Sequence, residues 1–453
     1  MSELFVEILQ TSSLGDRSYL AHDGRVAVVV DPQRDIDRVL ALAGRLGVRV
    51  THVVETHLHN DYVSGGLALA RVTGASYLVN AADAVDFERV PVTDGLLVDV
   101  SPLMSLRVVA TPGHTFHHLS YLLLGSDEPV GVFTGGSLLF GTTGRTDLLG
   151  SSHAASLAEH QHHSVRRLAD LLPDGAHVWP THGFGSFCSA GQTDATSSTI
   201  GRERTANPAL RLEAPDFVAS TLAGLDRYPA YYAHMGARNS AGADLIDLSP
   251  VRPADAAELA TRIGAGEWVV DLRTRKAFAE RHLAGTLSFG LDGALATWLG
   301  WMAPWGAPIT LLGESAEQVA EAQRELARIG IDRPAAAALP DFSGPSASAF
   351  ASLRTATWAG FAAVIEESDV ILDIRLPNEW RVGHVAEAIH VPLPDLPSAL
   401  GTLPPGTIWV HCASGYRAAA AASYLQRAGR SVVHIDDAFP HAAANGFAVV
   451  TSP

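Results

Sequence analysis

The sequence predicts an α/β protein built from more than one domain. Its 453 residues exceed what one ordinary hydrophobic core accommodates. Short apolar runs such as residues 26–30 and 50–55 alternate with helical segments such as 36–46, which is typical of α/β folds. Two later segments, beginning at Val269 and at Ile371, resemble one another and indicate an internal duplication. We therefore expect several α/β domains in one chain.

The composition excludes some classes of partner. Apolar residues make up 47% and charged residues 18%, as in globular proteins, and no apolar run is long enough to cross a bilayer. A net charge of −16 argues against nucleic acid, because phosphate binding requires concentrated Lys and Arg. Residues 1–10 alternate like a strand and lack a signal-peptide pattern, so we expect a cytoplasmic protein. In that compartment the two cysteines are thiols available for chemistry.

Two breaks in the pattern predict three domains. Residues 228–250 are interrupted by Pro, Gly, Tyr and Asn, which favours a linker on a surface. Residues 335–351 are rich in Ala, Ser, Pro and Gly and are interpreted as a second linker. The predicted domains are residues 1–248, which include the first linker, residues 249–345 and residues 346–453.

The two copies of the duplication share one order of elements. Each has a short buried strand ending in Asp-Leu/Ile-Arg, a helix, a His and a second short strand. The copies differ after a later strand, where Gly313 of the first copy occupies the position of Cys412 in the second. Only the second copy carries a thiol at this position, so we expect the first to act as a scaffold.

Cys412 lies between a strand and a helix. The run TIWVHCASGYRAAAAASYLQRAG places it directly after residues 408–411 and before an Ala-rich helix. The tight loop through Ser414, Gly415 and Tyr416 directs backbone N–H groups and the helix N-terminus at the sulfur. These groups favour a thiolate or a persulfide anion, with Arg417 as a two-pronged donor. The alternative is a small buried Cys that packs at a strand end.

Residues 346–453 resemble the rhodanese sulfurtransferases through the motifs LDIRLPNEWRVGHVAEAIHVPL and CASGYRAA. Four residues separate Cys412 from Arg417, one fewer than in the cysteine phosphatases with this loop, so a phosphatase is disfavoured. The resemblance implies that Asp373 and Arg375 brace the active loop. It also makes the first copy a degenerate rhodanese domain. Glu387 departs from the family, which usually has Gly there.

Histidines follow strand-like segments in the N-terminal part. In VVETHLHNDYVSGG, His57 and His59 stand at alternate positions after a strand, so both imidazoles point the same way. Asp61 follows them, His114 follows a second strand and His182 a third. The five residues predict a convergent metal site, and the alternative is that such histidines only cap turns.

The motifs THLHND, TPGHT, FTGG, GRTD and THG resemble the metallo-β-lactamase fold, an αββα sandwich, over residues 1 to about 210. Among its members the chain looks most like persulfide dioxygenases fused to tandem rhodanese domains. The resemblance implies one Fe(II), with Zn as the other candidate, that oxidises a low-molecular-weight thiol persulfide to sulfite with O2. It also implies exchange of sulfane sulfur with thiosulfate or small thiols.

Three further residues are candidates near this site. Arg145 and Asp147 in GTTGRTDLLG anchor the substrate or brace the cleft. Cys188, six residues after His182, either relays a persulfide near the metal or is a structural buried thiol.

Two positions depart from relatives of this fold. Tyr62 stands where two-metal hydrolases have a second-site His, which favours one metal and iron over zinc hydrolysis. Gly136 stands where the dioxygenase family has its carboxylate ligand. Three outcomes follow: a three-His face of His57, His59 and His114, which we favour; Asp61 as the carboxylate; or weak metal binding and lost oxygenase activity.

The leading hypothesis is a bifunctional enzyme that oxidises a thiol persulfide and transfers sulfane sulfur through Cys412. One alternative is a zinc thioester hydrolase of glyoxalase II type with a rhodanese tail. Another is a sulfur carrier whose first domain is a metal-free binding module. We also expect a homo-oligomer, a dimer or tetramer, in which aromatic residues are buried: Tyr228, Tyr231, Tyr232, Trp298, Trp301 and Trp305.

Overall fold

The computed structural model describes residues 4–126, 128–191, 193–342, 349–366 and 368–451. The chain forms two compact units, Met1–Ile246 with Ala327–Gly330 and Asp247–Leu326 with Ile331–Pro453. Within the described ranges, no helix is long and apolar enough to cross a membrane. The expected boundary between residues 345 and 346 lies outside the described residues, so the three-domain division stays a prediction.

Two six-stranded sheets form the centre of the first unit, in the orders β1-β2-β3-β4-β5-β6 and β14-β13-β10-β9-β8-β7. Side chains of both sheets, among them Tyr19, Leu106 and Phe133, share one buried core, so the sheets lie face to face. Their strands are β1 (Phe5–Thr11), β2 (Asp16–His22), β3 (Val26–Val30), β4 (Arg49–Val54), β5 (Ser76–Asn80), β6 (Val90–Val92), β7 (Leu97–Ser101), β8 (Met104–Ala110), β9 (Leu119–Gly125), β10 (Glu128–Gly135), β13 (His177–Pro180) and β14 (Ser198–Thr199). A separate small hairpin joins β11 (Leu138–Leu139) to β12 (Thr142–Thr143).

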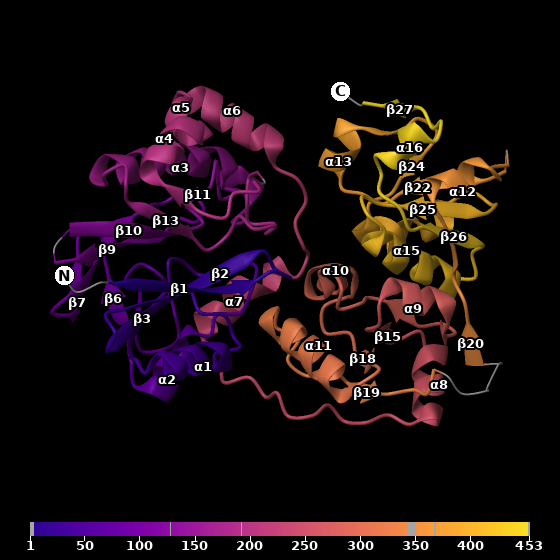
Figure 1. Ribbon diagram of the computed structural model, residues 1–453, viewed down its shortest axis with the longest axis horizontal. Coiled ribbons are helices and arrows are strands. Elements are labelled where there is room, and N and C mark those ends of the chain that lie inside the picture. Colours follow the sequence, from indigo (N-terminus) through magenta and orange to yellow (C-terminus); the bar gives the residue numbers. More distant parts are fainter. Residues whose placement is uncertain (1–3, 127, 192, 343–348, 367, 452–453) are drawn as a thin grey trace. The chain divides into compact units, whose positions relative to one another are not determined.

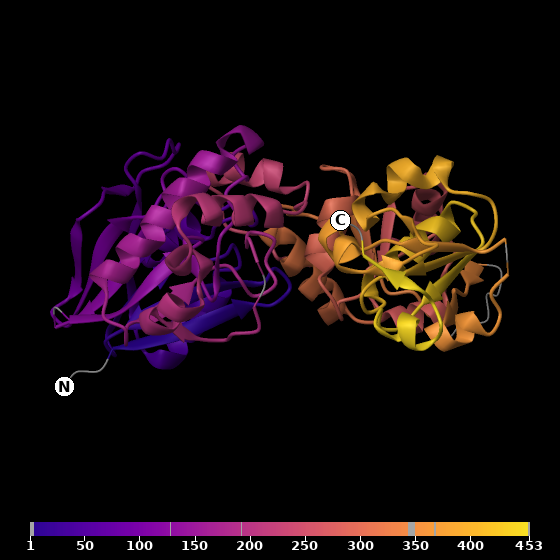
Figure 2. The same ribbon diagram turned by 90° about the horizontal axis from the view of Figure 1, so that it is seen from above.

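Helices cover the outer face of each sheet. On the first sheet lie α1 (Asp37–Leu46) and α2 (Gly66–Thr73), which bury apolar side chains such as Val39 and Leu67 against it. On the second lie α3 (Ala154–Leu171), α4 (Ile200–Ala206), α5 (Pro208–Arg211) and α6 (Ala214–Gly224). The four layers are visible edge-on in Figure 1, and the helices α3 to α6 lie in front of their sheet when seen from above in Figure 2. The predicted αββα sandwich is confirmed.

The strands of the first unit end just before the predicted site residues. His57 follows β4, His114 follows β8, Gly136 follows β10 and His182 follows β13. The His57 ring centroid lies 4.8 Å from that of His114 and 5.3 Å from that of His182. One end of the sandwich therefore gathers residues that are far apart in the sequence.

The second unit contains two parallel sheets, of order β17-β15-β18-β19 and β21-β26-β25-β22-β24. The first has β15 (Trp268–Asp271), β17 (Leu287–Ser288), β18 (Ile309–Leu312) and β19 (Ala336–Ala338), with α8 (Ala256–Gly264), α9 (Arg275–Glu280), α10 (Leu295–Met302) and α11 (Ala316–Arg328). The second has β21 (Arg354–Ala356), β22 (Val370–Asp373), β24 (Ile389–His390), β25 (Ile408–His411) and β26 (Val432–Ile435), with α12 (Trp358–Ala362), α13 (Pro377–Val382), α14 (Leu396–Ala399), α15 (Tyr416–Arg427) and α16 (His441–Ala444). The shared orders β17-β15-β18 and β24-β22-β25 show the duplication in three dimensions.

Both predicted linkers contain regular structure. Within residues 228–250 the chain forms α7 (Tyr232–Ala241), whose Asn239 donates N–H groups to the carbonyls of His59 (2.8 Å) and Tyr62 (2.9 Å). Within residues 335–351, β19 joins the first parallel sheet, and β20 (Phe350–Ala351) pairs with β16 (His282–Leu283). The expectation of loop structure was wrong at these positions; at Ala336–Ala338 the small side chains fit a buried strand as well as a loop.

The aromatic residues proposed for a dimer contact are mostly covered by their own chain. Tyr231, Tyr232, Trp298 and Trp301 are at most 9% exposed, whereas Trp305 is 40% exposed. The aromatic argument for an oligomer therefore loses most of its support, and the oligomeric state stays a prediction.

Candidate functional site

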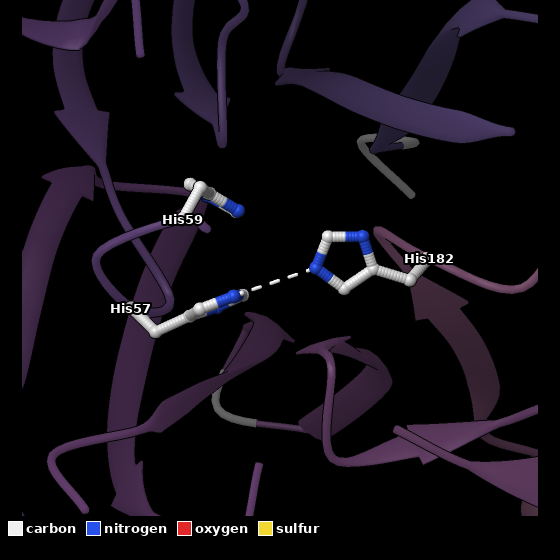
Figure 3. A group of neighbouring side chains, drawn as sticks. All are labelled: His57, His59 and His182. Carbon is white, nitrogen blue, oxygen red and sulfur yellow. Dashed lines mark hydrogen bonds between the residues drawn. The ribbon is translucent and has the colours of Figure 1, made fainter. Parts of the chain in front are cut away.

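Three histidines form a buried cluster at one end of the sandwich. His57, His59 and His182 converge from two strand ends, as Figure 3 shows. One nitrogen from each lies within 4.8 Å of the others, and the two Nε2 atoms of His57 and His182 are 3.4 Å apart. All three side chains are buried. An imidazole cluster of this kind is a potential metal site.

His114 contributes a fourth ring from the end of β8, in the same sheet as the strand β13 that precedes His182. Its Nδ1–H donates to the Arg145 carbonyl at 2.7 Å, while its buried Nε2 has no partner among the described residues. The potential ligand atoms of His114, His182 and Cys188 lie within 4.8 Å of one another, and so do those of His57, His59 and His182. The favoured three-His face of His57, His59 and His114 is thus not among the groupings within 4.8 Å, whereas His57, His59 and His182 are.

Two carboxylates orient His182. Its Nδ1 lies 2.9 Å from Asp16 Oδ1 and 3.2 Å from Asp61 Oδ2, which leaves Nε2 directed toward His57. Against the effect of burial, these carboxylates raise the pKa of His182 to about 10. A carboxylate that holds the outer nitrogen is the usual support of a metal-bound imidazole. Asp61 Oδ1 is buried without a partner among the described residues, so Asp61 itself remains a candidate ligand.

His59 has a similar support on its other side. Its Nε2 lies 3.4 Å from Asp31, 3.3 Å from Glu55 and 3.0 Å from the hydroxyl of Tyr62. Its Nδ1 is buried and unpartnered among the residues described. Although burial opposes it, the Asp31 and Glu55 carboxylates raise the pKa of His59 to about 9. Tyr62 therefore acts as a hydrogen-bonding neighbour of His59 and offers no second imidazole.

Gly136 leaves no room for a side chain. A Cβ atom placed there would collide with the ring of His114. The Gly136 N–H donates to Nε2 of His118 at 3.0 Å, and Nδ1 of His118 is 2.8 Å from the Thr111 hydroxyl. His114 thus occupies the space that a carboxylate at this position would need.

The residues present fit a single metal ion held by imidazoles. Burial lowers the pKa of His57 well below its ordinary value and that of His114 to about 3, so both rings are neutral and carry a lone pair. The orphaned nitrogens of His59 and His114 are buried polar atoms whose desolvation an ion would offset. Imidazole nitrogens, with carboxylates beside the other nitrogen of His59 and His182, are ligands that suit iron or zinc.

Cys188 and Arg145 brace the loop beside the cluster. Arg145 donates to Asp147 at 2.7 Å and 2.9 Å and to the Phe187 carbonyl at 3.0 Å, while its backbone N–H donates to the Cys188 carbonyl. The guanidinium is buried, so these contacts favour bracing over substrate anchoring. Burial, helped by Asp61 and Asp16, raises the pKa of Cys188 well above its ordinary value, which favours a neutral thiol.

The Cys412 loop has a turn that directs one amide at the sulfur. Gly415 adopts a φ of 102°, a left-handed conformation that favours glycine, and its N–H lies 3.1 Å from Sγ of Cys412. The α15 helix begins at the next residue, Tyr416. Cys412 is only 1% exposed, but its sulfur faces an amide and a helix N-terminus. Ser414 lies exposed on the outside of the turn.

Arg417 makes a different contact from the one expected. Both of its terminal nitrogens donate to the Glu379 carboxylate, at 2.6 Å and 2.7 Å, and its guanidinium lies 5.1 Å from the Trp298 ring centroid. The two-pronged donation predicted for the sulfur is therefore directed at Glu379. Glu379 is the third residue of α13, in the motif LPNEW, and nothing in that motif relates it to Arg417.

The Asp and Arg of each repeat form the same brace. Asp373 accepts from the backbone and side chain of Arg375, and Asp271 does the same for Arg273. These pairs are buried at the carboxyl ends of β22 and β15. In the first repeat Gly313 follows β18 where Cys412 follows β25 in the second. The repeat fold therefore persists where the thiol is missing.

Sequence reasoning missed several residues that surround the sites. These are Asp16, Asp31, Glu55, His118, Asn239 and Glu379. Asp16 lies at the start of a buried strand without any motif, and it reaches His182 only through the fold. His118 was visible in the run HTFHH that begins at His114, but its spacing gave no reason to separate it from turn-capping histidines.

Comparison with known proteins identifies both parts of the chain. The model of the metallo-beta-lactamase superfamily matches residues 17–176, and that of the rhodanese-like domain matches residues 357–442. The human mitochondrial persulfide dioxygenase ETHE1 is 30% identical over 210 residues, which cover 46% of this chain and 74% of that protein. A hydroxyacylglutathione hydrolase of Pseudomonas entomophila is 32% identical over 35% of this chain and 57% of that protein.

One solved structure extends the similarity beyond the first unit. A metallo-beta-lactamase from Staphylococcus aureus is 28% identical, with a TM-score of 0.67, over 75% of this chain and 99% of that chain. From the matched motifs, the sandwich and these relatives, the chain belongs to the persulfide dioxygenase family of the metallo-β-lactamase superfamily and carries a rhodanese-like domain in its C-terminal part.

Proposed function

We propose that this protein is a bifunctional sulfur-handling enzyme. Its first unit oxidises a low-molecular-weight thiol persulfide to sulfite with O2, and its Cys412 domain moves sulfane sulfur between small carriers. The observation that supports this is the presence in one chain of a buried imidazole cluster and a thiol with an amide at its sulfur. The two chemistries share one intermediate, R–S–SH.

The oxidation balances with O2 and water as co-reactants. R–S–SH, O2 and H2O give R–SH, sulfite and two protons. A single Fe(II), held by His57, His59 and His182 with His114 adjacent, would supply the redox chemistry toward O2. The chain contributes orientation and exclusion of water: Asp16 fixes the outer nitrogen of His182, and the cluster is buried throughout.

The transfer step uses the Cys412 thiolate as the nucleophile. It attacks the outer sulfur of thiosulfate, so the new Cys412 S–S bond forms while the thiosulfate S–S bond breaks. Sulfite leaves with the bonding electron pair. The total charge is −3 both for the thiolate with thiosulfate and for the persulfide anion with sulfite. The Gly415 N–H and the start of α15 stabilise the sulfur anion. A small thiolate then takes the outer sulfur and regenerates Cys412.

Two assays on the full chain test the two halves. Fe-loaded protein should consume O2 and form sulfite from glutathione persulfide. If the protein binds iron but neither O2 uptake nor sulfite is detected, the oxygenase half is excluded. Cys412→Ser should abolish thiosulfate:cyanide sulfurtransferase activity, and retained activity would exclude the transfer half. Sulfite formation from persulfide should survive this substitution, since the imidazole cluster lies in the other unit.

A second candidate for the first unit is a thioester hydrolase. It is favoured by the similarity to hydroxyacylglutathione hydrolases. Tyr62 and Gly136 oppose it, because neither supplies a ligand for a second metal. Two zinc ions per chain, together with turnover of S-lactoylglutathione, would establish the hydrolase in place of the oxygenase. A metal-free binding module would bind neither metal.

A further inference from the structure

The Cys412 loop rests on the repeat that lacks the cysteine. The Tyr416 hydroxyl donates to the Gly290 carbonyl at 2.8 Å, and the Tyr416 ring lies so close to Gly293 that a Cβ there would collide with it. Trp298 of the same repeat lies beneath the Arg417 guanidinium. The first repeat therefore forms part of the surroundings of the reactive thiol.

A second guanidinium reaches this loop from the first repeat. Arg275, the first residue of α9, donates through Nε to Asp436 at 2.7 Å and contacts Asp292 through NH1 at 3.4 Å. A Cβ placed on Gly415 would lie 3.2 Å from Arg275 Nε. Arg275 thus lies against the residue whose N–H faces the Cys412 sulfur.

The two arginines near the thiol differ in how they are held. Arg417 directs both terminal nitrogens at Glu379 and its side chain is 12% exposed. Arg275 makes one short and one long contact, and its side chain is 27% exposed. A guanidinium has five N–H donors, so Arg275 retains donors for an incoming anion. Burial opposes it, but Asp436, Asp292 and the Cys412 sulfur raise the pKa of Arg275.

We infer that Arg275 binds the sulfonate oxygens of thiosulfate, and of the sulfite that leaves, at the Cys412 site. The inference rests on the proposed sulfur transfer through Cys412. It identifies Arg275 as the group that selects the sulfur donor. A planar guanidinium donates to two oxygens of a sulfonate at once. A small neutral thiol has no sulfonate oxygens, so it does not gain this contact. The Cys-less repeat is then one wall of the active site and determines which sulfur donors it accepts.

The test is the kinetics of the full chain with thiosulfate as donor and dithiothreitol as a neutral acceptor. Arg275→Gln should lower kcat/KM for thiosulfate about tenfold, the effect of losing one charge-assisted contact, and leave kcat/KM for dithiothreitol unchanged. A loss below twofold, or an equal loss for both substrates, would overturn the inference.

Arg262→Gln is the matched control. Arg262 lies in the same repeat and pairs with two carboxylates, Glu258 at 2.8 Å and Glu267 at 2.6 Å, with a side chain 16% exposed. It belongs to α8 and makes none of the contacts described at the thiol loop. Arg262→Gln should leave kcat/KM for thiosulfate and for dithiothreitol as in the wild type. An equal loss of thiosulfate turnover in this control would indicate a general effect on the repeat.

A double variant separates anion binding from the loss of the ion pair. In Arg275→Gln alone, Asp436 keeps its charge and repels thiosulfate. Arg275→Gln with Asp436→Asn removes that repulsion, and the defect for thiosulfate should persist. Full recovery would show that Arg275 only neutralises Asp436. If Arg275→Gln does not fold, Arg275→Lys keeps the charge but loses the fork, and it should show a smaller defect of the same selectivity. Absence of thiosulfate turnover in the wild type would instead refute the proposed transfer.

Discussion

The Arg417 guanidinium and the Glu379 carboxylate form a two-pronged ion pair, with N···O distances of 2.6 Å and 2.7 Å. The pair joins the first turn of α15 to the first turn of α13. Both terminal nitrogens of Arg417, at the end of the Cys412 loop, are therefore engaged by Glu379.

Replacing Glu379 should weaken the second unit in a pH-dependent way. Although burial opposes it, Arg417 lowers the pKa of Glu379 below its ordinary 4.5. A lowered folded-state pKa stabilises the fold above pH 4.5, and this stabilisation disappears as the pH falls through the folded-state value. Since Glu379 is one-third exposed, Glu379→Gln should cost only about 1 kcal/mol at pH 7.

Calorimetric unfolding at pH 7 and at pH 4 measures this difference, with Glu387→Gln as the exposed control. The gap between Glu379→Gln and the wild type should shrink at the lower pH. A gap that is constant or grows would show that the ion pair is not the cause.

Adding a methyl group at Gly136 should disturb the imidazole cluster. A Cβ there meets the His114 ring, so Gly136→Ala must displace that ring and reduce the metal bound per chain. Elemental analysis after reconstitution with Fe(II) measures the loss. Gly175→Ala is the control, because a Cβ at that position meets nothing within 4 Å. Equal metal content in the two variants would place the ion away from His114.

Asp16→Asn should weaken metal binding without removing a ligand. Asp16 holds Nδ1 of His182 at 2.9 Å, and loss of such an outer partner typically costs about 10–100-fold in affinity. Equilibrium dialysis with Co(II) as a redox-stable probe gives the affinity, and the exposed Asp99→Asn serves as control. An affinity within about twofold of the wild type would exclude His182 as a ligand oriented by Asp16.

Cys188 should be unreactive in the folded protein. Its side chain is fully buried and its pKa is raised well above 9.0 by burial, then by Asp61 and Asp16, so it remains a thiol. A Cys412→Ser chain should therefore release no thionitrobenzoate from Ellman's reagent when native, and one equivalent after unfolding. Rapid labelling of the native variant would support the persulfide relay in place of a structural thiol.

The fold was predictable from local patterns. Alternating strands and helices predicted an α/β chain, and the repeated Asp-Leu/Ile-Arg strand ends predicted the duplication. The sandwich followed from the resemblance of the histidine motifs to the metallo-β-lactamase fold. The histidines were predictable because they follow directly on strands whose ends meet. Ala336–Ala338 was missed because three alanines carry no strand signal, and only pairing with β18 makes them a strand.

The supports of each site were not predictable, because they depend on distance in space. Asp16 and His182 are 166 positions apart, and Arg275 and Asp436 are 161 apart, so no local spacing relates them. The expected role of Arg417 failed for the same reason: the sequence placed a cation beside the sulfur but did not reveal that Glu379 would compete for it.

The hydrogen bond from Tyr416 to Gly290 bears on how this chemistry is inherited. A gene rearrangement that carried residues 346–453 alone would keep Cys412 but lose three groups of the first repeat. These are the Gly290 carbonyl, the Trp298 indole and the Arg275 guanidinium. On the proposed transfer through Cys412, the two repeats act as one unit, so a change in the copy without a cysteine should also affect its twin.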